Sequence, residues 1–112
     1  MDNKKRVILI DLDGVLNEYT GNFDPNFIPP VKEGAEQFLE DLSQDYTLKL
    51  FTTRNLLLAS QWLSENRLDK YFTDITNIKV PCHLIADDRC VCFSGSYKDF
   101  KEKIKNYKVW FK

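Results

Sequence analysis

Two aspartates, Asp11 and Asp13, end a run of apolar residues that begins at Val7. Carboxylates that lie close together repel each other and are costly to bury, so such a pair needs a positive partner. Side chains of an extended backbone alternate, so residues two apart project to the same side. Gly14 follows and allows a sharp turn that exposes backbone N–H groups to an anion. The stretch therefore favours a site where a cation and a phosphate group meet.

Polar side chains also follow two later apolar runs, residues 46–51 and 83–86. They are Thr52, Thr53 and Arg54 after the first run and Asp87, Asp88 and Arg89 after the second. Carboxylate ligands without thiolates suit Mg²⁺. Beside such a metal, one carboxylate can attack phosphorus while a second acid protonates the leaving group. Hydroxyl and ammonium groups, including that of Lys79 before the last run, are suited to hold phosphate oxygens.

Apolar patterns next to these polar residues predict strands. Residues 7–10 are uniformly apolar, which is typical of a strand buried on both faces of a parallel sheet. Residues 46–51 and 83–86 have the length and composition of two further strands. Shorter strands are expected around Ile75, at 91–93 and, at an edge of the sheet, at 109–111.

Residues at helical spacing separate the predicted strands. Residues 32–44 place apolar side chains at i, i+3, i+4 and i+7, which indicates a helix. A second helix is expected at 56–65, and Ser96 is suited to cap a third. The third helix should bury a stripe made of Tyr97, Phe100, Ile104 and Tyr107. This alternation indicates an α/β fold, a single Rossmann-like parallel sheet with helices on both faces.

One edge of such a sheet should hold the site. Ligands of parallel α/β sheets bind outside the carboxyl ends of the strands, where the polar residues named above would meet. Residues 17–31 contain Gly21 and three prolines, so they are expected to form a loop beside this edge. Asn17 begins that loop, and it is either a substrate contact or an ordinary loop residue.

Length and composition indicate one domain that covers residues 1–112. Hydrophobic residues make up 43% and charged residues 29%, which are ordinary values for a globular protein. The net charge of −1 gives no support for binding to nucleic acid or to an anionic membrane. We find neither a secretory signal nor an apolar run near the roughly 18 residues that span a membrane. A cytoplasmic location is therefore expected.

Three cysteines lie in the last third of the chain, Cys82, Cys90 and Cys92. Their odd number argues against a disulfide framework and favours a reducing compartment. Together with His83 they suggest a zinc site, but their spacing is not that of a zinc knuckle. We therefore expect small, buried apolar residues rather than metal ligands.

The sequence resembles haloacid dehalogenase-like (HAD) hydrolases, with four motifs in order between Val7 and about Gly95. The motifs are Asp11-Leu12-Asp13-Gly14-Val15-Leu16, then Thr52 after residues 48–51, then Lys79, and finally Asp87-Asp88 after residues 83–86. The third motif of close relatives usually reads Lys-Pro, whereas this sequence has Lys79-Val80-Pro81. The short segments Thr52-Thr53-Arg54 and Asp87-Asp88-Arg89 are similar to those of small HAD phosphatases of bacteria and phages.

The resemblance implies a role for each matched residue. Asp11 would attack phosphorus and bind Mg²⁺. Asp13 would act as general acid and base, and its backbone carbonyl would contact the metal. Of Asp87 and Asp88, one would bind the metal directly and the other through water. The phosphate-binding residues would be Thr52, with Thr53 as the competing hydroxyl, and Lys79.

The resemblance implies a Mg²⁺-dependent phosphohydrolase with a minimal cap loop, acting on a phosphomonoester through an aspartyl-phosphate. The same intermediate would serve a phosphotransferase, and the fold also suits a catalytically weak regulatory module that binds metal and phosphate. Arg54 and Arg89 either contact substrate phosphate or brace the site by pairing with carboxylates. The expected partner is a phosphorylated small molecule, although an open site also admits larger phosphoesters.

Overall fold

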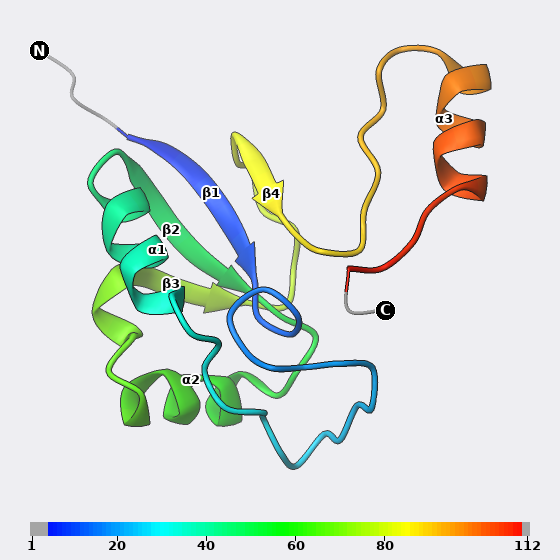
Figure 1. The fold of residues 1–112 in the computed structure, drawn as a ribbon. Coiled ribbons are helices and arrows are strands. Elements are labelled where there is room, and N and C mark those ends of the chain that lie inside the picture. Colours follow the sequence, from blue (N-terminus) through cyan, green and yellow to red (C-terminus); the bar gives the residue numbers. More distant parts are fainter. Residues whose placement is uncertain (1–4, 111–112) are drawn as a thin grey trace, which may run out of the picture.

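A four-stranded parallel sheet lies at the centre of the fold (Figure 1). The computed structural model describes residues 5–110. The strands are β1 (Arg6–Asp11), β2 (Tyr46–Phe51), β3 (Phe72–Thr76) and β4 (Leu84–Ala86). They lie in the order β3-β2-β1-β4, and every pair of neighbours is parallel. The predicted α/β fold with a single parallel, Rossmann-like sheet is therefore confirmed.

β1 joins the two halves of the sheet. It pairs with β2 from Arg6 to Asp11 and with β4 from Ile8 to Ile10. Leu9 and Ile10 are fully buried, as expected for a strand that lies between two others in a parallel sheet. Because the three strands are parallel, the residues that follow them emerge at one edge of the sheet.

Among the described residues, three α-helices and one short 3₁₀-helix accompany the sheet. They are α1 (Ala35–Ser43), α2 (Leu56–Glu65), η1 (Asp69–Tyr71) and α3 (Tyr97–Lys105). α1 begins later than residue 32 because Gly34, with φ of 90°, interrupts the helical backbone. Asn55 and Ser96 cap α2 and α3 by accepting backbone N–H groups at 3.0 and 3.2 Å. In the described part of the chain, every helix is too short or too polar to cross a membrane.

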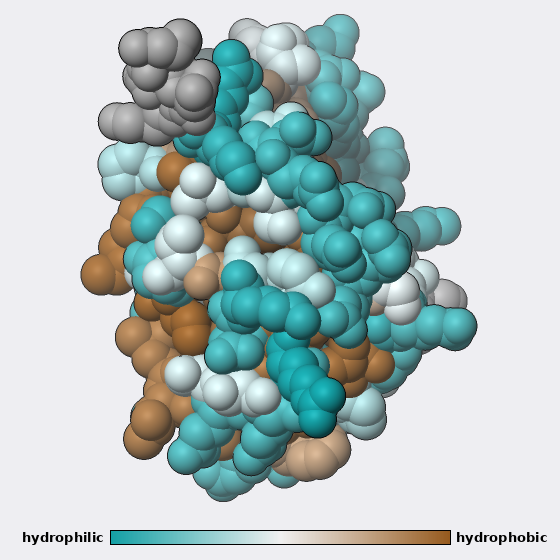
Figure 2. All heavy atoms as spheres, turned by 90° about the vertical axis from the view of Figure 1, so that its left-hand side faces the viewer, coloured by the Kyte–Doolittle hydropathy of each residue, from teal (hydrophilic) through white to brown (hydrophobic). Residues whose placement is uncertain are grey.

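α1 and α2 pack on the same face of the sheet. Ile8 and Ile10 of β1 and Leu48 and Leu50 of β2 share one core cluster with both helices. The buried helix residues of this cluster are Ala35, Leu39, Ala59, Trp62 and Leu63. Full burial of a leucine or isoleucine contributes about 1.5–3 kcal/mol, so this cluster anchors the strands. Figure 2 shows the side of the molecule that carries α1, which is mostly hydrophilic, with hydrophobic atoms gathered along one edge of the view.

α3 departs from the sequence-based expectation. Figure 1 shows it apart from the sheet at the end of a long connection from β4, and none of its residues is buried. Tyr97 and Ile104 are 81% and 55% exposed, so the prediction of a buried stripe is wrong for both. The Phe93 ring packs against Tyr97 and Phe100 at centroid distances of 5.3 and 5.1 Å. The apolar side of α3 therefore faces its own preceding segment. Within residues 5–110 the helix layer expected on the second face of the sheet does not form, because α3 packs on residues of its own segment.

Two predicted short strands do not form within residues 5–110. Residues 91–93 and 109–110 have no strand pairing, and Phe111 lies outside the described residues. The chain leaves the sheet after Ala86, and the Cys92 carbonyl accepts a hydrogen bond from Lys103 at 3.3 Å. This part of the backbone therefore finds its partners outside the sheet.

The three cysteines are free thiols. Cys82 is half-buried, whereas Cys90 and Cys92 are exposed, so the expectation of burial is wrong for these two. The physical reason is their position on the segment that departs from the sheet after β4. Within the described residues, the side chains grouped closely enough to share a metal ion are aspartates, without cysteine or histidine.

The contrast between α1 and α3 predicts unequal effects of truncation. Leu39 of α1 is fully buried, so Leu39→Ala should lower the free energy of unfolding by about 2–5 kcal/mol. Ile104 of α3 is more than half exposed, so Ile104→Ala should cost less than about 1 kcal/mol. Urea unfolding of both variants measures the difference. Equal losses would mean that α3 packs on the sheet in solution.

Candidate active site

Three strand ends bring polar side chains to one edge of the sheet. Asp11 is the last residue of β1, Thr52 follows β2 and Asp87 follows β4. Because β1 lies between β2 and β4, these residues are neighbours at the edge. A cavity of about 200 Å³ opens there. Its lining includes Asp11, Asp13, Thr52, Thr53, Asp87 and Arg89.

Asp11, Asp87 and Asp88 form a cluster of carboxylates. Each offers one oxygen, and these oxygens all lie within 4.8 Å of one another. Burial first, and then the charges of Asp87, Asp88 and Asp13, raise the pKa of Asp11 to about 8. Burial also raises the pKa of Asp88, although a hydrogen bond from Trp110 opposes the shift. The fold therefore holds these groups together against their repulsion.

This acidic cluster fits a divalent cation that prefers oxygen ligands. Asp88 Oδ1 is buried and has no hydrogen-bond partner among the described residues, which a buried polar atom ordinarily has. A Cβ at Gly14 would overlap the Asp88 carboxylate, so a glycine is needed for this close approach. Hard carboxylate oxygens without nitrogen or sulfur donors match Mg²⁺. Asp11, Asp87 and Asp88 are the residues that could hold it.

Asp13 is held by the buried side chain of Arg54. The guanidinium donates from Nε to Oδ2 at 2.8 Å and from Nη2 to Oδ1 at 3.0 Å. Arg54 is 3% exposed, and it also donates to the Asp24 carbonyl at 2.8 Å and lies 4.6 Å from the Phe23 ring centroid. Such bidentate pairing satisfies a charge that burial removes from water. Of the two roles considered from the sequence, Arg54 therefore takes the bracing role.

Asn17 organises the turn that follows β1. Its Oδ1 accepts the backbone N–H groups of Gly14 and Tyr19, both at 3.1 Å, and its Nδ2 donates to Asp13 Oδ1 at 3.0 Å. The side chain is fully buried and therefore does not present itself to a substrate. All of its polar atoms are used within the turn, so Asn17 helps to hold the Asp13 carboxylate in place.

The turn after β2 is fixed by a residue that the sequence did not single out. Asn77 donates from Nδ2 to the carbonyl of Thr52 and, at 2.9 Å, to that of Arg54. Thr52 Oγ1 accepts the Arg54 N–H at 3.1 Å. Asn77 directly follows β3, so its place at the same sheet edge was the available signal. Thr52 and Thr53 are thereby held at the cavity.

The positive side chain on the described cavity lining is Arg89. Lys79, the lysine implied by the HAD motifs, is exposed and is not part of that lining. Asp87 accepts the Arg89 N–H at 2.9 Å, which shapes the turn after β4. The structure therefore brings together Asp11, Asp13, Thr52, Thr53, Asp87 and Asp88 but leaves Lys79 aside.

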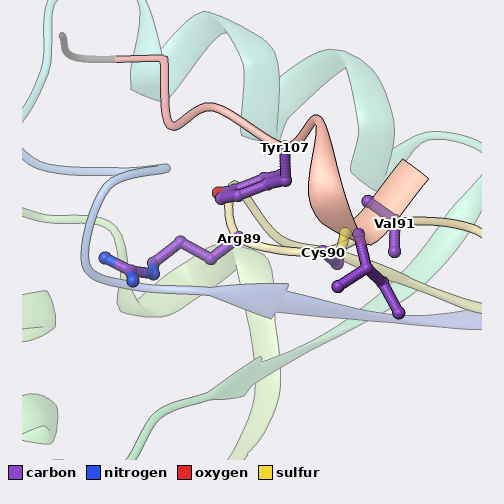
Figure 3. Close-up of a pocket in the computed structure, with 5 residues that line it drawn as sticks. Arg89, Cys90, Val91 and Tyr107 are labelled. Atoms are coloured by element: carbon purple, nitrogen blue, oxygen red, sulfur yellow. The ribbon is translucent and has the colours of Figure 1, made fainter. Parts of the chain in front are cut away.

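Residues after α3 also reach the acidic cluster, which the sequence did not predict. Trp110 donates Nε1–H toward Asp88 Oδ2 at 3.0 Å and the Gly14 carbonyl at 3.1 Å. Tyr107 donates its hydroxyl to the Asp88 carbonyl at 2.9 Å. Figure 3 shows the Tyr107 ring above Arg89 and Cys90, at a second cavity of about 210 Å³ that Ile104 also lines.

Comparison with known proteins supports the fold alone. No protein-family model matches the chain, and no curated protein does. A solved structure of a conserved protein from Bacteroides thetaiotaomicron is similar, with a TM-score of 0.61. The two are 22% identical, and the match covers 96% of this chain and 95% of that one. The arrangement of strands and helices is therefore shared over nearly the whole length of both chains.

The raised pKa of Asp11 predicts a stability change in the metal-free protein. Its pKa is about 8 in the folded state against an ordinary 3.8, so the unfolded chain loses this proton first and stability falls between these values as pH rises. Asp11→Asn removes that loss and should stabilise by about 2 kcal/mol near pH 8, less than full linkage because Asp11 is partly exposed.

Urea unfolding in the presence of EDTA measures this gain. It should be larger near pH 8 than near pH 5, because more of the wild-type penalty has accumulated at the higher pH. Asp45→Asn, at an exposed position, is the matched control and should show no such trend. A gain that is absent or independent of pH would contradict the raised pKa.

Proposed function

We propose that this chain is a Mg²⁺-dependent phosphohydrolase that cleaves a phosphomonoester through an aspartyl-phosphate on Asp11. The observation that carries the proposal is the cluster of Asp11, Asp87 and Asp88 oxygens within 4.8 Å, beside a cavity that Asp13 and Thr52 line. It offers cation ligands, a nucleophile and an acid in one place. The resemblance of these motifs to HAD hydrolases supports the same activity.

In the first step, an oxygen of Asp11 attacks phosphorus and the bond to the leaving group breaks. Asp13, which must be protonated at this point, gives its proton to the departing oxygen. In the second step, water attacks the phosphorus, Asp13 takes a proton from that water, and the bond between phosphorus and Asp11 breaks. Inorganic phosphate leaves and both carboxyl groups return to their starting state. Arg54 and Asn17 keep the Asp13 carboxyl in place for both proton transfers.

The metal ligands would be Asp11, Asp87 and Asp88, and the resemblance adds the backbone carbonyl of Asp13. When bound, Mg²⁺ offsets the negative charge of the phosphoryl group and of the carboxylates around it. Without a cation, the pKa of about 8 keeps Asp11 largely protonated at neutral pH, and a protonated carboxyl is a poor nucleophile. Activity should therefore require the divalent cation.

Thr52, Thr53 and Arg89 are proposed to hold the phosphoryl group. The Thr52 hydroxyl accepts the Arg54 N–H, so its own proton remains available for a phosphate oxygen. Arg89 supplies positive charge on the cavity lining, where the HAD pattern would place a lysine. Lys79 is exposed outside that lining, so Arg89 takes its place in this proposal.

The substrate is proposed to be a phosphorylated small molecule. Tyr19 and Phe23 of the 17–31 loop contribute aromatic surface to the cavity, which has a volume of about 200 Å³. The resemblance to HAD hydrolases implies that this loop takes the place of the separate cap domain that many of those enzymes carry. The short loop suits a cavity that opens to solvent, so the leaving group can extend beyond it.

Hydrolysis of an aryl phosphate tests the proposal. Wild-type protein should turn over p-nitrophenyl phosphate with Mg²⁺ and lose the activity in EDTA. Asp11→Asn should lower kcat by about 10³-fold or more, because it removes the nucleophile. Asp13→Asn should lower kcat by about 10²–10⁴-fold and leave Mg²⁺ affinity nearly unchanged, because its side chain is bound to Arg54.

Asp45→Asn is the control for loss of one carboxylate and should retain wild-type activity. The same activity in wild type and Asp11→Asn across a broad panel of phosphate esters would refute the hydrolase. If phosphate passes to an acceptor other than water, product analysis will show a phosphorylated acceptor in place of inorganic phosphate.

The pairing of Arg54 with Asp13 gives an independent prediction. Arg54→Lys keeps the positive charge but loses the two parallel hydrogen bonds to Asp13. We expect kcat to fall about 10-fold or more, with little change in the Mg²⁺ requirement. Circular dichroism checks the fold and steady-state kinetics measure kcat. Unchanged kcat would mean that the orientation of Asp13 does not limit the reaction.

A further inference from the structure

Two side chains that follow α3 bind the same residue of the acidic cluster. Trp110 reaches the Asp88 carboxylate at 3.0 Å, and Tyr107 reaches the Asp88 backbone carbonyl at 2.9 Å. The Trp110 N–H also lies 3.1 Å from the Gly14 carbonyl. Lys32 Nζ is 4.7 Å from the centroid of the Trp110 ring. The indole is therefore fixed between the turn after β1 and the turn after β4.

The two carboxylate oxygens of Asp88 have different surroundings because only one of them accepts the hydrogen bond from Trp110. Oδ2 accepts the indole N–H, whereas Oδ1 is buried without a hydrogen-bond partner among the described residues. Rotation of the carboxylate about its Cβ–Cγ bond would break the bond to the indole. Oδ1 is therefore held in one direction, and a cation that binds there displaces no protein hydrogen bond.

We propose that Trp110 is a positioning residue of the cation site, which holds the Asp88 carboxylate so that Oδ1 is ready for Mg²⁺. This inference rests on the proposed magnesium site. Groups that donate hydrogen bonds to metal ligands orient them, and losing such a group typically costs about 10–100-fold in metal affinity. Tyr107 steadies the backbone of the same ligand.

A role in substrate binding fits Trp110 less well. Trp110 is not among the described residues that line the cavity beside Asp11. Its polar edge points at Asp88 and Gly14, and Lys32 lies over its ring. A purely structural role would lower stability on mutation but would leave Mg²⁺ affinity intact. The two roles therefore differ in one measurable quantity.

Isothermal titration of the full chain with MgCl₂ measures that quantity. Trp110→Phe keeps an aromatic ring but removes the N–H donor, so the Kd for Mg²⁺ should rise about 10-fold. Trp62→Phe is the matched control, because it removes the other of the two tryptophans, a core residue distant in sequence from the cluster. Its Kd should equal that of wild type. Saturating Mg²⁺ should restore most of the kcat of Trp110→Phe.

Fluorescence supplies a second measurement that leaves Trp110 in place. In Trp62→Phe the remaining emission comes from Trp110, and Mg²⁺ should change its intensity or wavelength as Asp88 binds the ion. The inference is overturned if wild type and Trp110→Phe have equal Kd values for Mg²⁺, or if Mg²⁺ leaves the Trp110 emission unchanged. Neither result would contradict the proposed hydrolase. Absence of Mg²⁺ binding by the wild type overturns both.

Discussion

The repulsion among Asp11, Asp87 and Asp88 is the constraint around which this structure is arranged. Parallel pairing of β1 with β4 places their carboxyl ends together, and burial adds to the cost of charging Asp11. The opposing contribution comes from the core, where α1 and α2 cover β1 and β2 with apolar side chains. The free energy gained by burying these apolar side chains thus offsets the repulsion among the carboxylates at the sheet edge.

Asp11 and Asp13 show two solutions to the same electrostatic problem. Asp13 accepts two hydrogen bonds from the Arg54 guanidinium and one from Asn17, so the protein itself supplies the positive charge and the donors that stabilise this carboxylate. Asp11 faces other carboxylates, and its pKa rises to about 8. Different surroundings for two like groups are how a single site obtains two chemical roles from one side-chain type. Here the two aspartates have different surroundings although only Leu12 separates them in the sequence.

Sequence reasoning located the residues that directly follow strong strands, because the topology of a parallel sheet brings such positions to one edge. Asp11, Thr52 and Asp87 are of this kind. It did not locate Trp110, whose partner Gly14 is 96 positions away, because no local pattern encodes that contact. The apolar side of α3 was recognised, but periodicity does not say what that side packs against. Lys79 lies in an irregular connection, where motif spacing fixes no position in space.

The bond between Trp110 and Gly14 also joins two parts of the chain that are synthesised far apart in time. The turn that holds Asp11 and Gly14 is synthesised early, whereas the indole that meets it is added 96 residues later. Gly14 and Asp88 therefore depend on a residue near the other end of the described chain for this donor. A chain cut short before residue 107 would carry the four described strands and their carboxylates, but not the Tyr107 and Trp110 side chains that donate to Asp88. Completion of the site is thus tied to completion of this part of the polypeptide.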